Sequence, residues 1–430
     1  MKLLIYGLNF WPELTGVGKY SGEMAQWLVE RGHAVDVISA PPYYPAWQVA
    51  PGYSSTRYQR EAWGTGGRVR ITRCPLWVPH RVSTVRRLLH LASFALSSAP
   101  ALWRALRERP DVVMVVVPTL FVAPLALALA RLFQVPAWLH VQDFELDAMF
   151  SLTLDDATSG THPEGAVRRT LKRAALALES RIIRAFERAS SITPRMVDRL
   201  VAKGAAPERC VLFPNWVDLS AVYPLTGPNG WRRRLGLSDA EVLVLYAGNM
   251  GEKQGLDIVI DAARALADRP GIRFVLAGSG AAQERLMQTS AGLANVQWLP
   301  LQPAEHLNEM LNAADIHVLP QRADAADLVM PSKLTGMLAS GRATVGTAAA
   351  KTQMGRVLDE AGQRVEPGDT AALINALWTL ATDAPSRRTL GQRGRRYAEQ
   401  HLGQGPIMER FEQQLMLLVQ QPISARRSSR

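Results

Sequence analysis

Short apolar runs alternate with longer helical stretches twice along this chain. The first series opens with an apolar run at 2–6, a helical stretch at 20–30 and a second apolar run at 34–39. Strands that alternate with helices form parallel sheets with helices on both faces, so this order predicts a doubly wound α/β domain. We expect the remaining strands of this domain at 69–73, 112–117, 137–141 and 191–193, and its remaining helices at 84–107, 120–133, 165–189 and 195–203.

A second series of the same kind begins at Val242. Its expected strands are 242–246, 273–277, 296–299, 316–319 and 343–345, with helices at 255–267, 281–289 and 303–312. A chain of 430 residues is long enough for two domains that each bury a full core. We place these domains at 1–215 and 216–400, with a Pro/Gly-bearing linker at 223–230. The last helix, 384–420, is expected to return to the first domain, which makes 401–430 a separate segment.

The chain carries a formal net charge of +11, which predicts an anionic partner: nucleic acid, anionic lipid or a phosphorylated substrate. No nucleic-acid motif is present, so we do not expect nucleic-acid binding. Two blocks hold many of the basic residues: Arg81, Arg86, Arg87, Arg104, Arg107 and Arg109, and then Arg168, Arg169, Lys172, Arg173, Arg181, Arg184 and Arg188.

In the second basic block, apolar residues recur near helical spacing at Leu171, Ala175, Leu178, Ile182 and Phe186. A basic amphipathic helix of this kind is typical of segments that lie on an anionic membrane surface. The alternative is a solvated helix face that has no membrane role.

Residues 112–130 form an uncharged run of 19 residues, long enough to suggest a transmembrane helix. Its first half is β-branched and ends at Pro118, whereas its second half is rich in Ala and Leu. This composition predicts a buried strand followed by a packed helix, and a membrane span is the alternative.

The two cysteines, Cys74 and Cys210, cannot build a disulfide framework, and no Cys/His pair has metal-ligand spacing. The apolar part of the N-terminus is too short for a secretory signal. These features predict a cytoplasmic protein without a metal site.

The segment that starts at Pro331 is expected to begin a helix, because proline suits a first helical turn. Leu334, Met337 and Leu338 follow at helical spacing, and Gly341 ends the pattern. The free amides at such a helix start, together with the ammonium of a lysine at position 333, could hold a phosphate or diphosphate. The alternative is an ordinary strand–loop–helix unit with a solvated lysine.

Glycines and polar residues mark the expected carboxyl edge of the first sheet. Gly16 and Gly18 would let the backbone approach a phosphate or an acceptor closely, or would only form a tight turn. His140, Gln142 and Asp143 end a strand at the edge where open α/β sheets bind ligands. For His140, a structural role is the alternative. Neither half carries the dinucleotide fingerprint or a complete P-loop, which argues against a hydride-transfer enzyme or an NTPase.

Four segments of the second half together resemble the donor half of family 4 retaining glycosyltransferases of GT-B fold. They are Tyr-Ala-Gly-Asn-Met-Gly-Glu-Lys-Gln-Gly-Leu-Asp at 246–257, Leu-Ala-Gly-Ser-Gly at 276–280, Ala-Ala-Asp-Ile-His-Val-Leu-Pro-Gln at 313–321, and Pro-Ser-Lys at 331–333. The first half is similar to the WcaI-type branch of colanic acid biosynthesis fucosyltransferases. The matching segments are Phe-Trp-Pro-Glu-Leu-Thr-Gly-Val-Gly-Lys at 10–19, His-Val-Gln-Asp-Phe-Glu at 140–145 and Pro-Asn-Trp-Val-Asp at 214–218.

This resemblance, which spans 1–418, implies two Rossmann-like domains facing a cleft, with the nucleotide sugar on the C-terminal domain and the acceptor on the N-terminal one. It implies that Lys253 contacts the donor diphosphate and that Gln142, with His140 and Asp143 beside it, contacts the transferred sugar. The implied donor-binding residues are Gly16, Gly18, Gly248, Asn249, Gly278, Pro331, Ser332, Lys333 and Leu334.

The chain departs from the family pattern at two positions. Asn249 lies where many relatives carry arginine, and Gly336 stands where a glutamate would hold the ribose. The partner glutamate of that pattern falls at Leu328, so its neighbour Asp327 becomes a catalytic candidate that would contact the donor sugar, with Asp324 as a further one.

The resemblance implies transfer with retention of configuration, by same-face attack assisted by the leaving phosphate, without a metal or other cofactor. We expect transfer of fucose from GDP-fucose to a lipid-diphosphate-linked saccharide in exopolysaccharide biosynthesis, by an enzyme bound peripherally to the anionic inner leaflet. The alternatives are a UDP-hexose-dependent transferase, a UDP-sugar epimerase of the same fold, and a non-catalytic partner protein.

Overall fold

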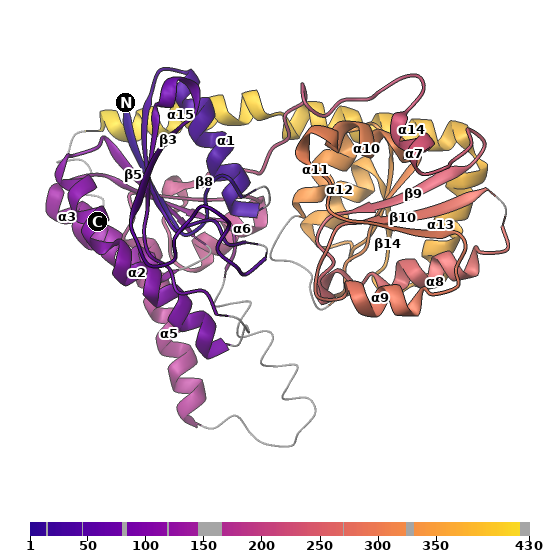
Figure 1. Ribbon diagram of the computed structural model, residues 1–430. Helices are drawn as coiled ribbons and strands as arrows, with labels where there is room; N and C mark the ends of the chain where they lie inside the picture. The colour runs from indigo at the N-terminus through magenta and orange to yellow at the C-terminus, as the bar shows by residue number, and fades with distance from the viewer. Residues whose placement is uncertain are drawn as a thin grey trace. The chain divides into compact units, whose positions relative to one another are not determined.

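The computed structural model describes residues 1–13, 16–44, 46–79, 84–117, 120–144, 166–269, 271–323 and 331–421. The chain forms two compact units, each with a sheet between helices (Figure 1). Unit 1 comprises Met1–Pro214 and Met408–Arg430, and unit 2 comprises Asn215–Ile407. The expected linker at 223–230 lies inside unit 2, where the backbone amide of Tyr223 donates to Asn308 at 3.1 Å and that of Leu225 donates to Asn312 at 2.8 Å.

Unit 1 contains an eight-stranded sheet in the order β3-β4-β2-β1-β5-β6-β7-β8. Its pairs are parallel except β3 with β4, which is antiparallel. The strands are β1 (Lys2–Gly7), β2 (Ala34–Ser39), β3 (Gln59–Trp63), β4 (Val69–Arg73), β5 (Val112–Val117), β6 (Ala137–Val141), β7 (Arg188–Ser191) and β8 (Cys210–Leu212). The helices are α1 (Gly16–Glu30), α2 (Thr84–Arg107), α3 (Ala123–Phe133), α5 (Ala166–Arg184) and α6 (Pro194–Ala202), with short 3₁₀ turns η1 (Thr65–Gly67), η2 (Leu120–Val122) and η3 (Pro207–Arg209).

Unit 2 contains a parallel six-stranded sheet in the order β11-β10-β9-β12-β13-β14. Its strands are β9 (Val242–Ala247), β10 (Ile272–Ala277), β11 (Val296–Leu299), β12 (Ile316–Leu319), β13 (Ala343–Thr347) and β14 (Gln363–Val365). Its helices include α7 (Gly230–Arg234), α8 (Asp257–Ala265), α9 (Gln283–Thr289), α10 (Leu307–Ala313), α11 (Ser332–Ala339), α12 (Gln353–Ala361), α13 (Thr370–Thr382) and α14 (Ala384–Tyr397), with 3₁₀ turns η4 (Glu252–Gln254) and η5 (Ala304–His306).

The uncharged run at 112–130 contains a strand and a helix, as its composition predicts. All six residues of β5 are buried, which suits a β-branched strand in the middle of a parallel sheet. The second half of the run contains η2 and most of α3. Among the helices that the structure describes, none is long and apolar enough to cross a membrane.

Two expected elements have different bounds. The strand expected at 191–193 is β7 at Arg188–Ser191, because Thr193 instead caps α6 by accepting a hydrogen bond from the Met196 amide at 3.1 Å. The helix expected at 384–420 is interrupted: α14 runs into a π-helical turn, η7 (Ala398–Leu402), and α15 (Gln404–Gln420) starts after it.

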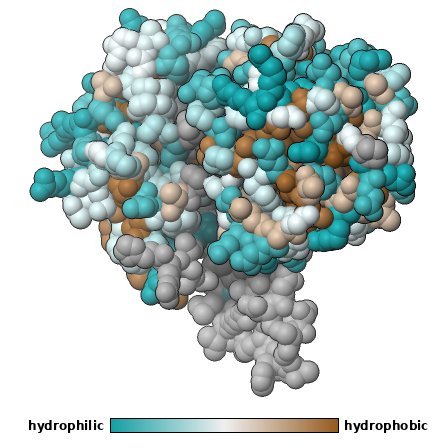
Figure 2. All heavy atoms as spheres, turned by 45° about the vertical axis from the view of Figure 1, so that its right-hand side comes forward, coloured by the Kyte–Doolittle hydropathy of each residue, from teal (hydrophilic) through white to brown (hydrophobic). Residues whose placement is uncertain are grey.

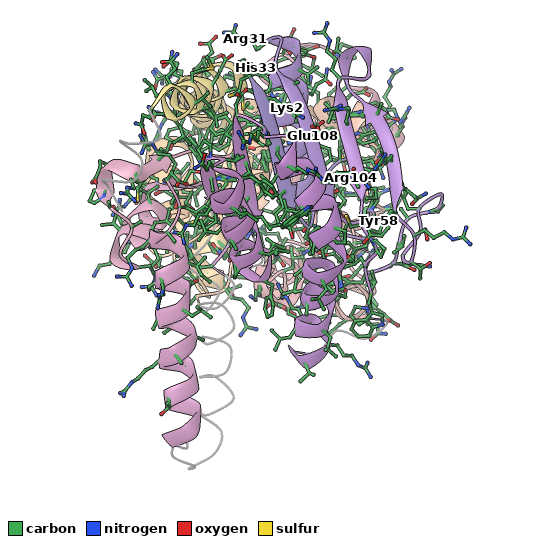
Figure 3. All side chains as sticks on the ribbon, turned by 90° about the vertical axis from the view of Figure 1, so that its left-hand side faces the viewer. Lys2, Arg31, His33, Tyr58, Arg104 and Glu108 are labelled. Carbon is green, nitrogen blue, oxygen red and sulfur yellow. The ribbon has the colours of Figure 1, made fainter. Side chains whose placement is uncertain are left out.

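The end of α15 packs on unit 1. The ring of Phe411 stacks on Phe213 with centroids 4.0 Å apart and meets Trp138 edge-on at 5.4 Å. Glu412 lies 2.6 Å from the ring nitrogen Nε2 of His33, one of the residues labelled in Figure 3. These contacts attach the C-terminal helix to the first sheet.

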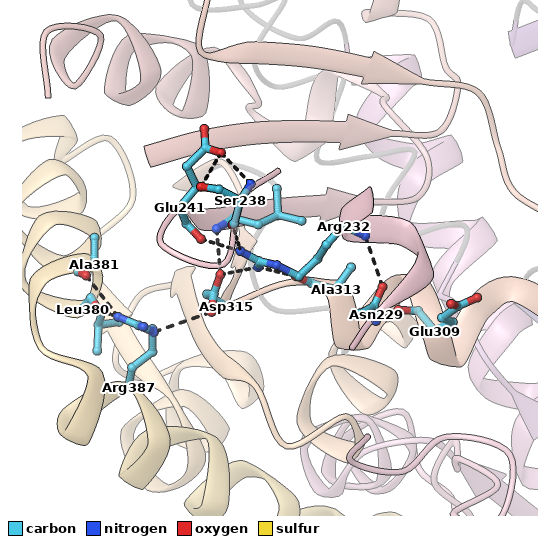
Figure 4. Close-up of polar contacts among 11 residues, drawn as sticks. Asn229, Arg232, Ser238, Glu241, Glu309, Ala313, Asp315, Leu380, Ala381 and Arg387 are labelled. Atoms are coloured by element: carbon cyan, nitrogen blue, oxygen red, sulfur yellow. Dashed lines mark hydrogen bonds and ion pairs between the residues drawn. The ribbon is translucent and has the colours of Figure 1, made fainter. Parts of the chain in front are cut away.

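A polar network fixes the amino ends of β9 and β12 in unit 2 (Figure 4). The Arg232 guanidinium donates to the Asp315 carboxylate at 2.8 Å and to the carbonyl of Glu241. Asp315 also accepts from the Leu243 amide at 2.9 Å, and Arg387 approaches the same carboxylate at 4.0 Å. The network lies at the end of the sheet opposite to the carboxyl edge.

The expected apolar face of the basic helix α5 is only partly free. Ile182 and Phe186 are buried in the core of unit 1, whereas Leu178 is 57% exposed. Glu179 is buried in an ion pair with Lys203. The C-terminal part of α5 therefore packs on the core of unit 1.

Hydrophilic residues dominate the surface in the view of Figure 2, with hydrophobic patches between them.

Candidate active site

Glycine turns shape the carboxyl edge of the unit 2 sheet. β9 ends in a turn at Gly248, whose amide donates to the Ala277 carbonyl at 2.8 Å, and the Met250 amide donates to the Ser279 carbonyl at 2.8 Å. A Cβ atom at Gly278 would lie 2.0 Å from the Gly248 carbonyl oxygen, so only glycine allows the two loops to touch backbone to backbone. Gly278 therefore positions the turn after β9.

Lys333 lies against this turn. Its Nζ donates to the carbonyl oxygen of Asn249 at 2.9 Å and to the hydroxyl of Tyr246, which itself donates to the same carbonyl. The ammonium is 4.4 Å from the centroid of the Tyr246 ring, and a Cβ at Gly248 would meet the lysine side chain. Asn249 thus contributes its backbone carbonyl, a role that does not depend on its side chain.

Burial lowers the pKa of Lys333 to about 7. Within the described ranges, no carboxylate lies within ion-pair distance of this ammonium, and its partners are neutral oxygens. A desolvated cation without an opposite charge is unfavourable, and an arriving anion would relieve that cost. The position of Lys333 is therefore suited to an anionic ligand.

The helix that carries Lys333 begins without a side-chain cap. Pro331, expected in the first turn, is the N-cap residue instead, so the helix starts one position later, at Ser332. The Pro331 carbonyl accepts from the Leu334 amide at 3.0 Å. Ser332 is exposed at the first turn, whereas the Leu334 side chain is fully buried in the core. The Leu334 side chain therefore contributes to packing and not to ligand contact. The amides of the first turn are the groups that an anion could reach.

Lys253 lies in η4, and its side chain is exposed. The two acidic residues near Lys253 in the sequence both form ion pairs with Arg285, Glu252 at 2.9 Å and Asp257 as well. The backbone carbonyl of Lys253 accepts from the Arg322 amide at 3.4 Å. Among the residues that the structure describes, no ion pair involves the Lys253 ammonium.

Gly336 lies in the middle of α11. A Cβ there would touch only a methyl group of Leu311, at 3.4 Å. The other two candidates near this helix, Asp324 and Asp327, lie outside the described residues.

Glu13 organises the carboxyl edge of the unit 1 sheet and was not predicted from the sequence. Its buried carboxylate accepts from the Asn9 side chain at 2.9 Å and from the backbone amides of Tyr43 and Tyr44 at 3.1 and 3.0 Å. Burial raises the pKa of Glu13, and these hydrogen bonds oppose the shift. A Cβ at Gly18 would lie 2.6 Å from Glu13 Cβ, so Gly18 is required for packing on this side chain.

Gly16 differs from Gly18, because a Cβ atom at this position would meet no other atom within 4 Å. Its φ of +59° favours glycine at the start of α1. Among the described atoms, none fills the space beside Gly16 at the first turn of that helix, and the approach of a ligand to this backbone stays a prediction.

Arg73 is the second unpredicted residue of this edge. It is fully buried at the end of β4 and donates to Glu61 at 2.6 Å, to the Ser39 hydroxyl at 2.8 Å and to the carbonyl oxygens of Ala40 and Trp11. Its guanidinium joins the ends of three strands to the first loop. An arginine at the end of a strand gives no signal of such burial in a single sequence.

His140 does not reach the surface. Its ring is 3% exposed, lies 2.9 Å from the Ser190 hydroxyl and packs 5.1 Å from Phe213. Burial lowers the pKa of His140 to about 3, so the ring is neutral. The ring is therefore part of the core, which supports the structural role that the sequence left open for His140.

Gln142 and Asp143 follow β6 at the carboxyl edge. Gln142 is 8% exposed, and its backbone N–H donates to the Val117 carbonyl at 3.1 Å. Asp143 is partly exposed. The next charged residues, Glu145 and Asp147, lie outside the described residues.

Comparison with known proteins assigns both halves of the chain to glycosyltransferase families. Residues 15–216 match the family described as Glycosyl transferase 4-like domain, and residues 241–383 match Glycosyl transferases group 1. The putative colanic acid biosynthesis glycosyl transferase WcaI of Escherichia coli strain K12 is 41% identical over 418 residues, which cover 96% of this chain and 98% of that protein.

Solved glycosyltransferase structures share the fold. Sucrose-phosphate synthase from Thermosynechococcus elongatus superposes with a TM-score of 0.73 at 17% identity, covering 97% of this chain and 99% of that structure. HepE of Anabaena in complex with UDP-glucose gives a TM-score of 0.67 at 14% identity, again covering 97% and 99%.

The two parallel α/β units are those of the GT-B fold, and the match to one relative extends along nearly the whole chain. The protein therefore belongs to the glycosyltransferases that combine a 4-like N-terminal domain with a group 1 C-terminal domain.

Proposed function

We propose that this protein is a retaining glycosyltransferase of exopolysaccharide biosynthesis that transfers fucose from GDP-fucose to a lipid-diphosphate-linked saccharide. The observation that carries the proposal is the 41% identity to the colanic acid biosynthesis glycosyl transferase over 96% of the chain. Identity at that level over both domains makes a related reaction the simplest hypothesis.

The proposed donor site is the carboxyl edge of the unit 2 sheet. When the bond between sugar and diphosphate breaks, negative charge develops on the leaving group, and cations and aimed amides stabilise it. Lys333 and the first amides of α11 would hold one phosphate, and the exposed Lys253 would reach the other. Asp327, for contact with the donor sugar, remains part of the proposal from the sequence.

In unit 1, we keep Gly16 as a donor-binding residue and Gln142 and Asp143 as contacts of the transferred sugar. They lie after β1 and β6 at the carboxyl edge of the unit 1 sheet, the edge where open α/β sheets bind ligands. Glu13 and Arg73 hold the loops of this edge in place. We propose that no metal is needed, because lysines and amides supply the positive charge at the leaving group.

A UDP-hexose donor is the second candidate. It is favoured by the solved complex of HepE with UDP-glucose, whose chain superposes on this one with a TM-score of 0.67.

The lipid-linked acceptor also implies peripheral association with an anionic membrane, which we include in the proposal.

Thermal shift with UDP, GDP, GDP-fucose and UDP-glucose tests the donor, because a ligand that binds the folded state raises the melting temperature. We expect the largest shift with GDP and GDP-fucose, followed by transfer to lipid-linked saccharide with the same anomeric configuration, in the presence of EDTA. A shift with uridine nucleotides alone would favour the UDP-hexose enzyme. Donor conversion without acceptor would indicate an epimerase, and no shift at millimolar nucleotide would indicate a non-catalytic protein.

A further inference from the structure

The solvent side of α2 carries no charge along most of its length. Residues 88–103 contain no Lys, Arg, Asp or Glu. Leu89, Leu96 and Trp103 recur every seven residues, which places them on one side of the helix, and they are 56%, 76% and 47% exposed. Phe94 and Leu102, on the opposite side, are fully buried in the core. A surface helix normally turns polar residues to water, so this exposed side requires another explanation.

The neighbouring α3 continues the apolar surface. Arg131 is its one charged residue, and Leu132 is 60% exposed. Phe121, just before α3, is 42% exposed. The Trp103 ring meets Phe133 of α3 edge-on, with centroids 5.1 Å apart, so the two helices lie side by side on one face of unit 1 (Figure 1).

We define the α2–α3 face by its large exposed apolar side chains: Val85, Leu88, Leu89, Leu96, Trp103, Phe121 and Leu132. These are 7 of the 17 exposed large hydrophobic residues in the part of the chain that the structure describes. Such a concentration on two adjacent elements marks an interaction surface, whereas scattered exposed apolar residues would not.

The charged residues within α2 and α3 are all basic, whereas the exposed Glu108 directly after α2 pairs with Lys2 at 2.7 Å. Arg104 and Arg107 are exposed at the end of α2, and Arg131 is exposed on α3. Arg131 also donates to the Ala185 carbonyl at 3.2 Å, which brings α3 next to the end of α5 and its exposed Arg184. Neither α2 nor α3 contains an acidic residue.

We infer that the α2–α3 face docks on an anionic lipid bilayer, with its apolar side chains in the interfacial layer and the flanking arginines at lipid phosphates. This combination of a broad apolar side and basic edges is typical of elements that lie in the membrane interface. A second copy of the chain fits less well, because a symmetric contact would bring the basic edges together. The inference rests on the peripheral membrane association proposed above and specifies the surface that makes it.

Flotation of the full chain with vesicles tests the surface. The vesicles contain phosphatidylglycerol and phosphatidylethanolamine, and neutral phosphatidylcholine vesicles serve as reference. We expect Leu96→Glu to weaken partitioning about 10-fold and the pair Leu89→Glu/Leu96→Glu about 100-fold, because a charge replaces an inserted apolar side chain. Leu417→Glu is the matched control, since Leu417 is 53% exposed in unit 1 on α15, outside the α2–α3 face, and it should partition like the unsubstituted protein.

Melting temperatures of all variants should agree, since the substituted side chains lie at the surface. Unchanged flotation of Leu96→Glu would overturn the assigned surface, while leaving membrane association itself in place. If the unsubstituted protein does not float, both fail. If Leu96→Glu instead converts a dimer to a monomer without vesicles, the face joins two copies and the inference is overturned. Transfer to a water-soluble acceptor should stay unchanged in Leu96→Glu, and its loss would also count against a purely membrane-binding role.

Discussion

The carboxyl edges of the two sheets hold their buried charges in different ways. In unit 1, Glu13 accepts three hydrogen bonds, and Arg73 pairs with Glu61 and with backbone oxygens. In unit 2, the partly buried Lys333 has only the Tyr246 hydroxyl and the Asn249 carbonyl as partners among the described residues.

This difference distinguishes an edge whose charges hold the structure together from the edge proposed to bind the donor. The charges of unit 1 are satisfied within the protein, so they hold loops in place and leave little to gain from a ligand. The lysine of unit 2 is largely desolvated and has no carboxylate partner among the described residues, so an anion would gain free energy by pairing with it. The strands β4-β2-β1-β5-β6-β7 and β11-β10-β9-β12-β13-β14 have the same order along the chain, yet we propose different roles for the two edges.

Replacing Lys333 by methionine gives the largest expected effect. The substitution keeps the volume but removes the cation, so kcat/KM should fall about 100- to 1,000-fold, the size seen when one stabilising group is lost from a transition state. Stability should not fall, because the variant no longer buries a charge. Steady-state kinetics and thermal unfolding measure the two effects.

The control for this variant is Lys351→Met, which removes an exposed lysine of the same unit. It should retain activity. If Lys333→Met keeps full turnover, Lys333 does not contact the diphosphate and the contrast between the two edges loses its functional meaning.

Replacing Arg73 by methionine should lower stability and leave nucleotide binding unchanged, the reverse of what we expect for Lys333→Met. We expect a loss of about 3 kcal/mol in the free energy of unfolding, because Glu61 and the Ala40 and Trp11 carbonyls lose a buried partner. Nucleotide affinity of the folded fraction should be unchanged, since the proposed donor site lies in unit 2. Denaturant titration and calorimetry provide the two readings.

Arg70→Met is the comparison for that variant, because Arg70 is exposed and pairs with Asp36. Its loss should be at most about 1 kcal/mol. An equal loss of unfolding free energy in both variants would show that the buried Arg73 stabilises the fold no more than the exposed Arg70 does.

The affinity for a nucleotide sugar should depend on pH through Lys333. Its pKa in the free protein is lowered to about 7, and a bound diphosphate raises that pKa again. Below pH 7 the lysine is protonated in both states, so affinity is constant. Above pH 7 binding must take up a proton, and affinity should fall by up to about tenfold per pH unit.

Calorimetry in buffers of different ionisation enthalpy measures that proton directly. A nucleotide sugar is the right ligand, because it lacks the terminal phosphate that titrates near pH 6. Lys333→Arg should bind without this pH dependence, since its guanidinium stays charged. A pH-independent affinity in the unsubstituted protein would contradict the uncompensated state of Lys333.

The smallest expected effect comes from Gly336→Ala. Alanine favours the helix interior, and its Cβ would meet only Leu311 at ordinary contact distance. We expect the free energy of unfolding to rise by about 0.5–1 kcal/mol, with nucleotide affinity unchanged. A marked loss of affinity would mean that a ligand approaches the Gly336 backbone closely.

The sequence predicted most strands of both sheets within one residue, because buried parallel strands are short β-branched runs. The strands β3, β8 and β14 were missed. β3 has the sequence Gln-Arg-Glu-Ala-Trp and is a strand only because it pairs antiparallel with β4 at the sheet edge. The helices α12 and α13 were also missed, although Thr352 and Asp369 cap them and gave a readable signal.

Within the candidate site, the helix start and the lysine on which the proposed anion site of the Pro331 segment depends could be read from the sequence. The low pKa of Lys333 could not, because it results from burial beside Tyr246, which is 87 positions away. The burial of His140 was undecidable for the same reason. It depends on Phe213 and Ser190, which arrive from other strands and loops.

The sequence by itself determined the two α/β units, the glycine turns and the family, since these follow from local periodicity and short motifs. Tertiary structure alone decided which charges are satisfied: Glu13 and Arg73 have partners distant in the chain, and Lys333 is partly buried, with neutral partners in the described part of the chain. It also decided that the uncharged side of α2 faces outward. The physical reason is that desolvation and exposure depend on neighbours from the whole fold, which no local pattern specifies.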